Sequence, residues 1–205
     1  MLFKNSSSNK RGHKYIMEAV GIKKHYFIAL VPESPLRDTV DNFKREIRDR
    51  FGAAHALKSP AHITLQMPFH WLESEEYLLE KCLRQFASSQ IGLLVNLEGF
   101  DCFARRVLFV KVRDHLPLQQ LQSNLKKELI SQLGFPAPKQ TAKFHPHMTI
   151  ATRDLDESDF KEAWEAFHSR NFCASFKADS LFLLKHNGKC WDLFKEFPFN
   201  EGPGE

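Results

Sequence analysis

The sequence of 205 residues predicts a bilobal α+β protein whose two pseudo-symmetric lobes each carry a mostly antiparallel sheet flanked by helices. The main observation is an internal repeat, in which residues 26–52 align with 108–134 without a gap. Each copy then continues in the order strand, helix, strand, helix, strand. No linker separates the copies, so we expect one compact domain over 24–199, with repeat units at about 24–100 and 106–186.

Seven of the aligned pairs are identical, and the physical roles of the aligned residues match as well. The identical pairs are Phe27 and Phe109, Pro35 and Pro117, Leu36 and Leu118, Asn42 and Asn124, Lys44 and Lys126, Glu46 and Glu128, and Gly52 and Gly134. Each copy opens with a run of β-branched and aromatic residues, YFIALV or VLFVKV, which is typical of a buried strand.

A helix follows the first strand of each copy. Its first turn carries a proline, whose missing N–H leaves no helical hydrogen bond unmade, and a glycine follows its last turn. Apolar residues recur between them at helical spacing and predict one buried stripe per helix. The stripes are Leu36, Val40, Phe43 and Ile47 in the first copy, and Leu118, Leu121, Leu125 and Leu129 in the second.

The second strand of each copy carries a His-x-Thr motif. Chance placement of the 10 histidines would give well under one such triplet, yet two occur at equivalent positions of the repeat. Residues two apart on a strand share a face, so His62 projects with Thr64, and His147 with Thr149. The alternate residues should enter the core: Ile63, Leu65, Met148 and Ile150. A pseudo-two-fold axis would bring the two motifs face to face across a central cleft.

The remainder of each copy follows the same order. Acidic stretches at 72–86 and 155–167 predict the second helix of each unit. Further strands are expected at 91–100, 172–178, 180–186 and 189–199.

The bulk composition is that of an ordinary globular protein with a mildly basic net charge of +4, too small for a protein that coats nucleic acid. We expect flexible tails at 1–23 and 200–205, with Met17 as an alternative start. No signal peptide or membrane span is recognised, so a cytoplasmic location and no membrane partner are expected. The cysteines lack a CxxC pair and are expected to be free thiols: Cys82, Cys102, Cys173 and Cys190.

Two imidazoles and two hydroxyls on facing strands suit in-line displacement at phosphorus. One neutral histidine takes a proton from the attacking oxygen, and one protonated histidine gives a proton to the leaving oxygen. The threonine hydroxyls can donate to the non-bridging oxygens as negative charge develops. The symmetry of the site gives almost no basis for deciding which histidine is the acid and which is the base. Our working assignment makes His62 the acid and His147 the base. This chemistry requires no metal.

Two other interpretations of the histidines remain open. A histidine on a strand is often only a hydrogen-bonded core or surface residue. A metal site is the other alternative, because His145 and His147 have a His-x-His spacing. The first copy has Pro60 where the second has His145, and neither motif contains a cysteine or an acidic residue, which disfavours the metal site.

The stretches HITL and HMTI, about 85 residues apart in a duplicated α+β frame, resemble the two-histidine (2H) phosphoesterase superfamily. The similarity is greatest to its 2′-5′ RNA ligase-like and cyclic phosphodiesterase branch, and it covers most of residues 24–199. The resemblance implies metal-independent chemistry on 2′,3′-cyclic phosphates or 2′-5′ linkages. It also implies a catalytic tetrad of His62, Thr64, His147 and Thr149, with no cofactor.

Members of this superfamily often carry basic residues beside the cleft. Arg153 could hold a phosphate with two hydrogen bonds, and Lys58 and Lys143 each precede a motif histidine by four residues. The aromatic candidates for stacking on a base or lining the cleft floor are Phe69, Trp71, Phe144 and Tyr26. Each has an ordinary alternative: an exposed charge for the basic residues, and packing for the aromatic ones.

The leading hypothesis is therefore an enzyme that opens 2′,3′-cyclic phosphates on RNA ends or nucleotides. The same site could instead serve a 2′-5′ phosphodiesterase or a 2′-5′ RNA ligase. A third hypothesis is a non-catalytic protein that binds RNA ends. The expected partners are RNA ends or a small cyclic-phosphate nucleotide, and we expect a monomer.

Overall fold

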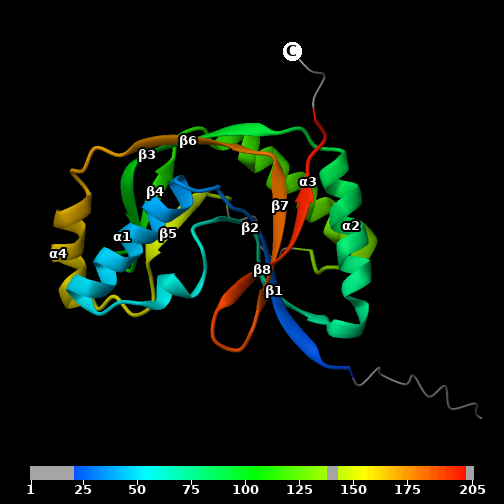
Figure 1. The fold of residues 1–205 in the computed structure, drawn as a ribbon, viewed down its shortest axis with the longest axis horizontal. Coiled ribbons are helices and arrows are strands. Elements are labelled where there is room, and N and C mark those ends of the chain that lie inside the picture. Colours follow the sequence, from blue (N-terminus) through cyan, green and yellow to red (C-terminus); the bar gives the residue numbers. More distant parts are fainter. Residues whose placement is uncertain (1–20, 138–142, 202–205) are drawn as a thin grey trace, which may run out of the picture.

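The computed structural model describes residues 21–137 and 143–201, and it contains two antiparallel four-stranded sheets with flanking helices (Figure 1). This confirms the predicted α+β fold. Sheet 1 has the order β2 (Ile63–Leu72), β1 (Lys23–Leu30), β7 (Ser180–His186) and β8 (Trp191–Pro198). Sheet 2 has the order β5 (His147–Ala151), β4 (Val107–Val112), β3 (Leu93–Phe103) and β6 (Cys173–Ala178).

The two repeat units exchange strands, so neither sheet is built from one unit alone. In the first unit, β3 pairs with β4 of the second, and in the second unit β7 pairs with β1 of the first. A tight turn with left-handed φ angles of 46° at Ala104 and 51° at Arg105 returns the chain from β3 directly onto β4. The exchange is reciprocal, which preserves the pseudo-symmetry and leaves the motif strands β2 and β5 at an edge of their sheets.

The helices are exchanged in the same way. Figure 1 shows α1 (Leu36–Phe51) and α4 (Glu157–Phe167) beside sheet 2, and α2 (Glu76–Ser88) and α3 (His115–Leu133) beside sheet 1. Accordingly, α1 contacts β5 and α3 contacts β2. Two 3-10 helices, η1 (His55–Lys58) and η2 (Glu73–Glu75), precede β2 and α2. Each motif strand is therefore packed against a helix of the other repeat unit.

The predicted apolar stripes and helix ends agree with the structure. All four leucines of the α3 stripe are buried, as are Val40 and Ile47 of α1, whereas Leu36 and Phe43 are partly buried against the core. Gly52 and Gly134 adopt left-handed φ angles of 70° and 67° and end α1 and α3, a conformation that suits glycine because it has no Cβ.

The two faces of each sheet carry different residues. The predicted core residues of the motif strands are all 2 % exposed or less: Ile63, Leu65, Met148 and Ile150. The opposite face, called the motif face below, carries the histidines and threonines. On sheet 1 this face holds a second, smaller apolar cluster of Phe27, Ala29, Val31 and Leu184, against which Phe182 and Trp191 pack.

The ends of the chain differ slightly from the prediction. Strand β1 begins at Lys23, inside the stretch expected to be a tail, while Met17 and the other residues up to 20 lie outside the described residues. Asn200 forms an isolated bridge with Ile91. None of the helices in the described parts of the chain is long and apolar enough to cross a membrane.

Candidate active site

His62 stands immediately before β2, and its ring is fixed by one hydrogen bond and one ring contact. Its Nδ1 lies 2.7 Å from the carbonyl oxygen of Pro60. Because a carbonyl can only accept, Nδ1 carries the proton and Nε2 is the nitrogen left for chemistry. The ring packs on Phe27, with centroids 4.8 Å apart.

His147 is held in the same way at the start of β5. Its Nδ1 donates to the carbonyl oxygen of His145 at 2.7 Å, and its ring packs on Phe109 at 4.9 Å. Phe27 and Phe109 are an identical pair of the repeat, and each is almost fully buried beneath its histidine. These phenylalanines were not among the site residues predicted from the sequence, although their identity at equivalent positions was available.

The two motifs lie near one another. Strands β2 and β5 are in contact, and a charge on His147 lowers the pKa of His62. A carboxylate also joins the segments that flank them: Asp154 Oδ2 accepts the backbone N–H groups of Ala54 at 2.9 Å and His55 at 2.7 Å. This bridge connects the loop before His62 with the loop after β5.

The surroundings of His62 favour its neutral form. Burial lowers its pKa to about 4, the hydrogen bond to Pro60 opposes the shift, and the charges of Lys44 and His147 lower the pKa further. Lys44 is 1 % exposed, donates to the carbonyl oxygen of Ser59 at 2.9 Å and pairs with Asp41 at 2.8 Å. A buried cation of α1 therefore lies next to the segment that leads into the first motif.

His147 has a different electrostatic environment. Burial lowers its pKa, the hydrogen bond to His145 raises it, and the His145 ring lowers it. No lysine is among these causes. Lys126, the repeat partner of Lys44, is partly exposed on α3 and lines a separate cavity beside Gln122 and Phe135.

The predicted basic residues flank both motifs. Lys58 and Arg153 are exposed, and their charges add to the effect of burial in lowering the pKa of His55. Arg153 also adopts a left-handed φ of 61°. Lys143 is exposed and contributes in the same direction to the pKa of His145, which burial lowers most.

Tyr26 requires a correction, because it does not line the motif face. It is fully buried on the opposite face, where its hydroxyl donates to Glu76 of α2. Burial and this carboxylate raise the pKa of Tyr26. Neighbouring residues on a strand face opposite ways, so the residue of β1 on the motif face is Phe27.

The other predicted aromatic residues make packing contacts. Phe69 and Trp71 lie 4.9 Å and 5.7 Å from the ring of Phe135, which follows α3, and Trp71 Nε1 donates to the carbonyl oxygen of Glu75. Phe144 is partly buried against the core, and its carbonyl oxygen accepts a hydrogen bond from Gln119. These contacts are those of the packing alternative, and stacking of these residues on a base stays a prediction.

Within the part of the chain that the structure describes, the His-x-His pair does not assemble into a larger ligand set. The ring centroid of His145 lies 4.7 Å from that of His115 and 5.1 Å from that of Phe103. Over residues 21–137 and 143–201, no group of three or more His, Cys, Asp or Glu side chains has the arrangement of a metal site.

Comparison with known proteins connects this geometry to one family. Residues 32–189 match the model of the 2′-5′ RNA ligase superfamily. A "Putative phosphoesterase" of Shouchella clausii is 26% identical over 177 residues, covering 84% of this chain and 96% of that protein. A second "Putative phosphoesterase", from Geobacillus kaustophilus, is 26% identical over 176 residues, covering 84% of this chain and 94% of that protein.

Solved structures show the same fold. Escherichia coli LigT in complex with 3′-AMP superimposes with a TM-score of 0.65 at 17% identity, covering 88% of this chain and 100% of LigT. LigT has also been solved with NADP+ and with ATP. The Thermus thermophilus protein TT0787 gives a TM-score of 0.62 at 18% identity, covering 87% of this chain and 100% of its own.

Proposed function

The chain belongs to the 2′-5′ RNA ligase superfamily, and we propose that it is a metal-independent phosphodiesterase that hydrolyses 2′,3′-cyclic phosphates on RNA ends or nucleotides. The observation that carries this proposal is the matched pair of hydrogen bonds from His62 and His147, each 2.7 Å from Nδ1 to the carbonyl two residues earlier. Both bonds fix the same tautomer and leave Nε2 available for proton transfer.

The charges around the two histidines support distinct roles, opposite to our working assignment from the sequence. Burial and Lys44 favour the neutral form of His62, which we assign as the base, while no lysine is among the causes that shift the pKa of His147, which we assign as the acid. The phosphate of the substrate brings a negative charge, which raises the pKa of both imidazoles and favours the protonated acid.

The proposed step is a single displacement at phosphorus. Water attacks while Nε2 of His62 takes one of its protons, and a new P–O bond forms. The bond from phosphorus to the 3′ oxygen breaks as Nε2 of His147 donates its proton to that oxygen, which leaves a 2′-phosphate and a free 3′ hydroxyl. Thr64 and Thr149 donate hydrogen bonds to the non-bridging oxygens.

Two further observations support a nucleotide substrate. Exposed cations lie near both motifs: Lys58, Arg153 and Lys143. LigT, which has the same fold, has been crystallised with 3′-AMP, ATP and NADP+. These ligands share a phosphate attached to a ribose, which is also the recognition unit of a 2′,3′-cyclic nucleotide.

The test is incubation of the protein with the four 2′,3′-cyclic nucleotides in the presence of EDTA, with products separated as 2′- or 3′-phosphates. We expect turnover to a 2′-phosphate that the chelator does not reduce. Activity that disappears with EDTA and returns with a divalent cation would contradict the metal-independent mechanism.

The same assay separates the alternatives. A panel that adds 2′-5′-linked dinucleotides and pairs of RNA ends detects a 2′-5′ phosphodiesterase or a ligase, which would use the same groups. A protein that only binds RNA ends would turn over none of these substrates, and His62→Ala would weaken binding alone.

A further inference from the structure

A group of imidazole and indole rings lies on the motif face of sheet 1, beyond His62. His25 and His70 are directly paired across β1 and β2, and their ring centroids are 3.6 Å apart. Trp191, at the start of β8, lies 4.9 Å from His186 and 6.3 Å from His25. His25 and His70 are exposed and His186 and Trp191 partly exposed, so a ligand can reach these four residues, called the histidine–tryptophan shelf below.

The shelf is continuous with the proposed catalytic histidine. Trp191 packs on Phe27 at 4.7 Å, and Phe27 packs on His62 at 4.8 Å. Alternation along β1 places His25 and Phe27 on the same face, which is the face of His62. The shelf is therefore a lateral extension of the floor beneath the first motif, separated from His62 by the width of about two rings.

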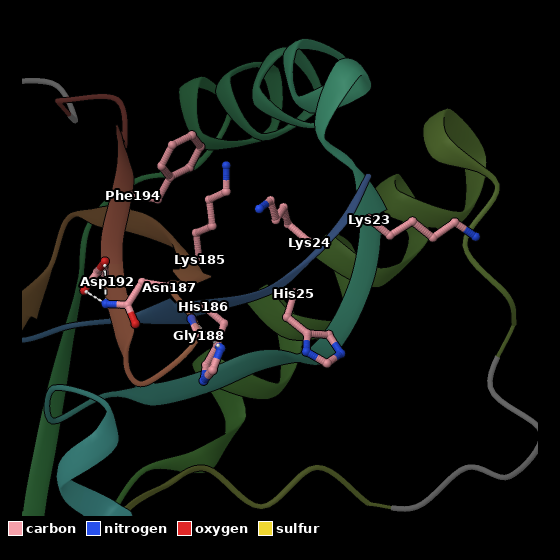
Figure 2. Close-up of a pocket in the computed structure, with 9 residues that line it drawn as sticks. All are labelled: Lys23, Lys24, His25, Lys185, His186, Asn187, Gly188, Asp192 and Phe194. Atoms are coloured by element: carbon pink, nitrogen blue, oxygen red, sulfur yellow. Dashed lines mark hydrogen bonds between the residues drawn. The ribbon is translucent and has the colours of Figure 1, made fainter. Parts of the chain in front are cut away.

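The sheet opens into a notch at the shelf. Pairing between β1 and β7 ends at Tyr26 and Lys185, while β1 runs on to Lys23 and β7 turns into the hairpin with β8. The diverging backbones leave a cavity of about 440 Å³ lined by both segments (Figure 2). That volume lies within the range of roughly 300–1,000 Å³ found for small-ligand sites.

The chemistry of the notch matches a nucleotide. Figure 2 shows His25 and His186 on one side of it and Lys24 and Lys185 on the other. Lys185 is paired with Glu73 and Glu76 and Lys24 is paired with Glu73, whereas within the described residues Lys23 has no acidic partner within 4 Å. Aromatic rings beside lysines provide stacking for a base and a charge for a phosphate.

The local contacts of two shelf histidines determine what they can offer a ligand. The N–H of Gly188 donates to Nδ1 of His186 at 3.1 Å, so this nitrogen carries no proton and Nε2–H remains as a donor. Burial and the neighbouring rings of His70 and His186 lower the pKa of His25. Neutral imidazoles offer a flat face and both a donor and an acceptor, as contact with a base requires.

We propose that the shelf and notch bind the nucleotide that precedes the reacting end of an RNA strand. The terminal nucleotide would occupy the motifs, and its neighbour would stack on Trp191 and the shelf histidines, with its phosphate near Lys23. This inference rests on the proposed function, because it places the end of the strand at His62 and His147. It makes an RNA end, rather than a free mononucleotide, the preferred substrate.

The test compares kcat/KM for a 2′,3′-cyclic mononucleotide with that for a trinucleotide ending in the same cyclic phosphate. We expect Trp191→Ala to lower the value for the trinucleotide by about five- to 150-fold, the range of one base–aromatic stack, with a much smaller loss on the mononucleotide. Lys23→Gln should act in the same selective direction. The matched control is Trp164→Ala, because Trp164 also has a histidine as a ring neighbour: the ring centroids of Trp164 and His168, at the end of α4, are 5.3 Å apart.

Trp191 contacts Phe27, so Trp191→Ala could also disturb His62. The variants Lys23→Gln and His25→Ala therefore decide whether the subsite exists. Equal losses on both substrates, or none, in these two variants would overturn the subsite and leave the proposed function standing. If the wild-type protein cleaves neither substrate, the proposed function fails, and binding of a fluorescein-labelled trinucleotide with a 2′-phosphate end is measured by fluorescence anisotropy. Binding that persists in Trp191→Phe and is lost in Trp191→Ala retains the shelf, and no binding by the wild-type protein overturns both.

Discussion

The two motif histidines have the same geometry and different electrostatics. His62 and His147 make the same hydrogen bond, to a carbonyl two residues earlier, and rest on phenylalanines that are equivalent in the repeat. Yet the charge of a buried lysine lowers the pKa of His62, whereas the only charge among the causes that lower the pKa of His147 is that of another histidine. The two repeat units share the hydrogen bond and the phenylalanine that orient each imidazole, and they differ in the neighbouring charges that affect its protonation. A symmetric frame can in this way supply one base and one acid.

Removing either histidine should have the largest effect. His62→Ala and His147→Ala should each lower kcat by about 10²–10⁴-fold, and the double variant should lose little more than the worse single one, because the two groups act in one step. Turnover of a 2′,3′-cyclic nucleotide measures both. The control is His168→Ala, whose Nδ1 contacts the carbonyl of Trp164 in a similar way on an exposed helix end.

A substrate with a good leaving group distinguishes the two roles. A 4-nitrophenyl phosphodiester needs no acid to protonate the departing oxygen, so His147→Ala should lose much less activity on it than His62→Ala. Equal losses would show that the two histidines are not divided into acid and base as proposed.

The pH dependence follows from the direction of both shifts. In the proposed mechanism the active form has neutral His62, with a pKa of about 4, and protonated His147, with a pKa below its ordinary 6.5. The value of kcat/KM should therefore peak on the acidic side of neutrality and fall about tenfold per pH unit above the pKa of His147. In His62→Ala the residual activity should still fall with rising pH, since only the acid remains. Residual activity that rises with pH would reverse the roles.

Lys44→Met should reduce the asymmetry between the two imidazoles. Without the ammonium group the pKa of His62 should rise, by roughly one unit or less for a single nearby charge. NMR titration of the His62 ring measures this directly, and the acid limb of kcat/KM should move to higher pH. Lys126→Met is the control, because Lys126 is the repeat partner of Lys44 and does not contribute to the pKa of either motif histidine. An unchanged His62 titration in a folded Lys44→Met protein would remove Lys44 as the cause.

Local patterns allowed the motif strands to be predicted, because alternation with a period of two places His62 and Ile63 on opposite faces whatever the tertiary fold. The same rule places Tyr26 and Phe27 on opposite faces of β1. The identity of Phe27 with Phe109 could have shown that Phe27 is the residue on the motif face. The exchange of β3 and β7 between repeat units could not be predicted this way, because strand partners are chosen by long-range packing. Lys44 lies 18 residues before His62 in sequence, and only the packing of α1 brings it close.

The smallest effect is expected for the carboxylate that bridges the loop before His62 and the loop after β5. Asp154→Ala removes the acceptor for the backbone N–H groups of Ala54 and His55, and it leaves the rings of both motif histidines untouched. Hydrogen bonds to a charged acceptor are worth about 1.5–3 kcal/mol when buried, but Asp154 is exposed, so the loss of stability should be about 1 kcal/mol or less. Since the loop before His62 then moves relative to the loop after β5, kcat should fall several-fold while KM changes little.

Asp156→Ala, two residues further along the same loop, is the control, and both variants are compared by urea unfolding and steady-state kinetics. If the two variants have the same kcat, the bridge does not align the motifs, and the contact between β2 and β5 alone must hold them in place.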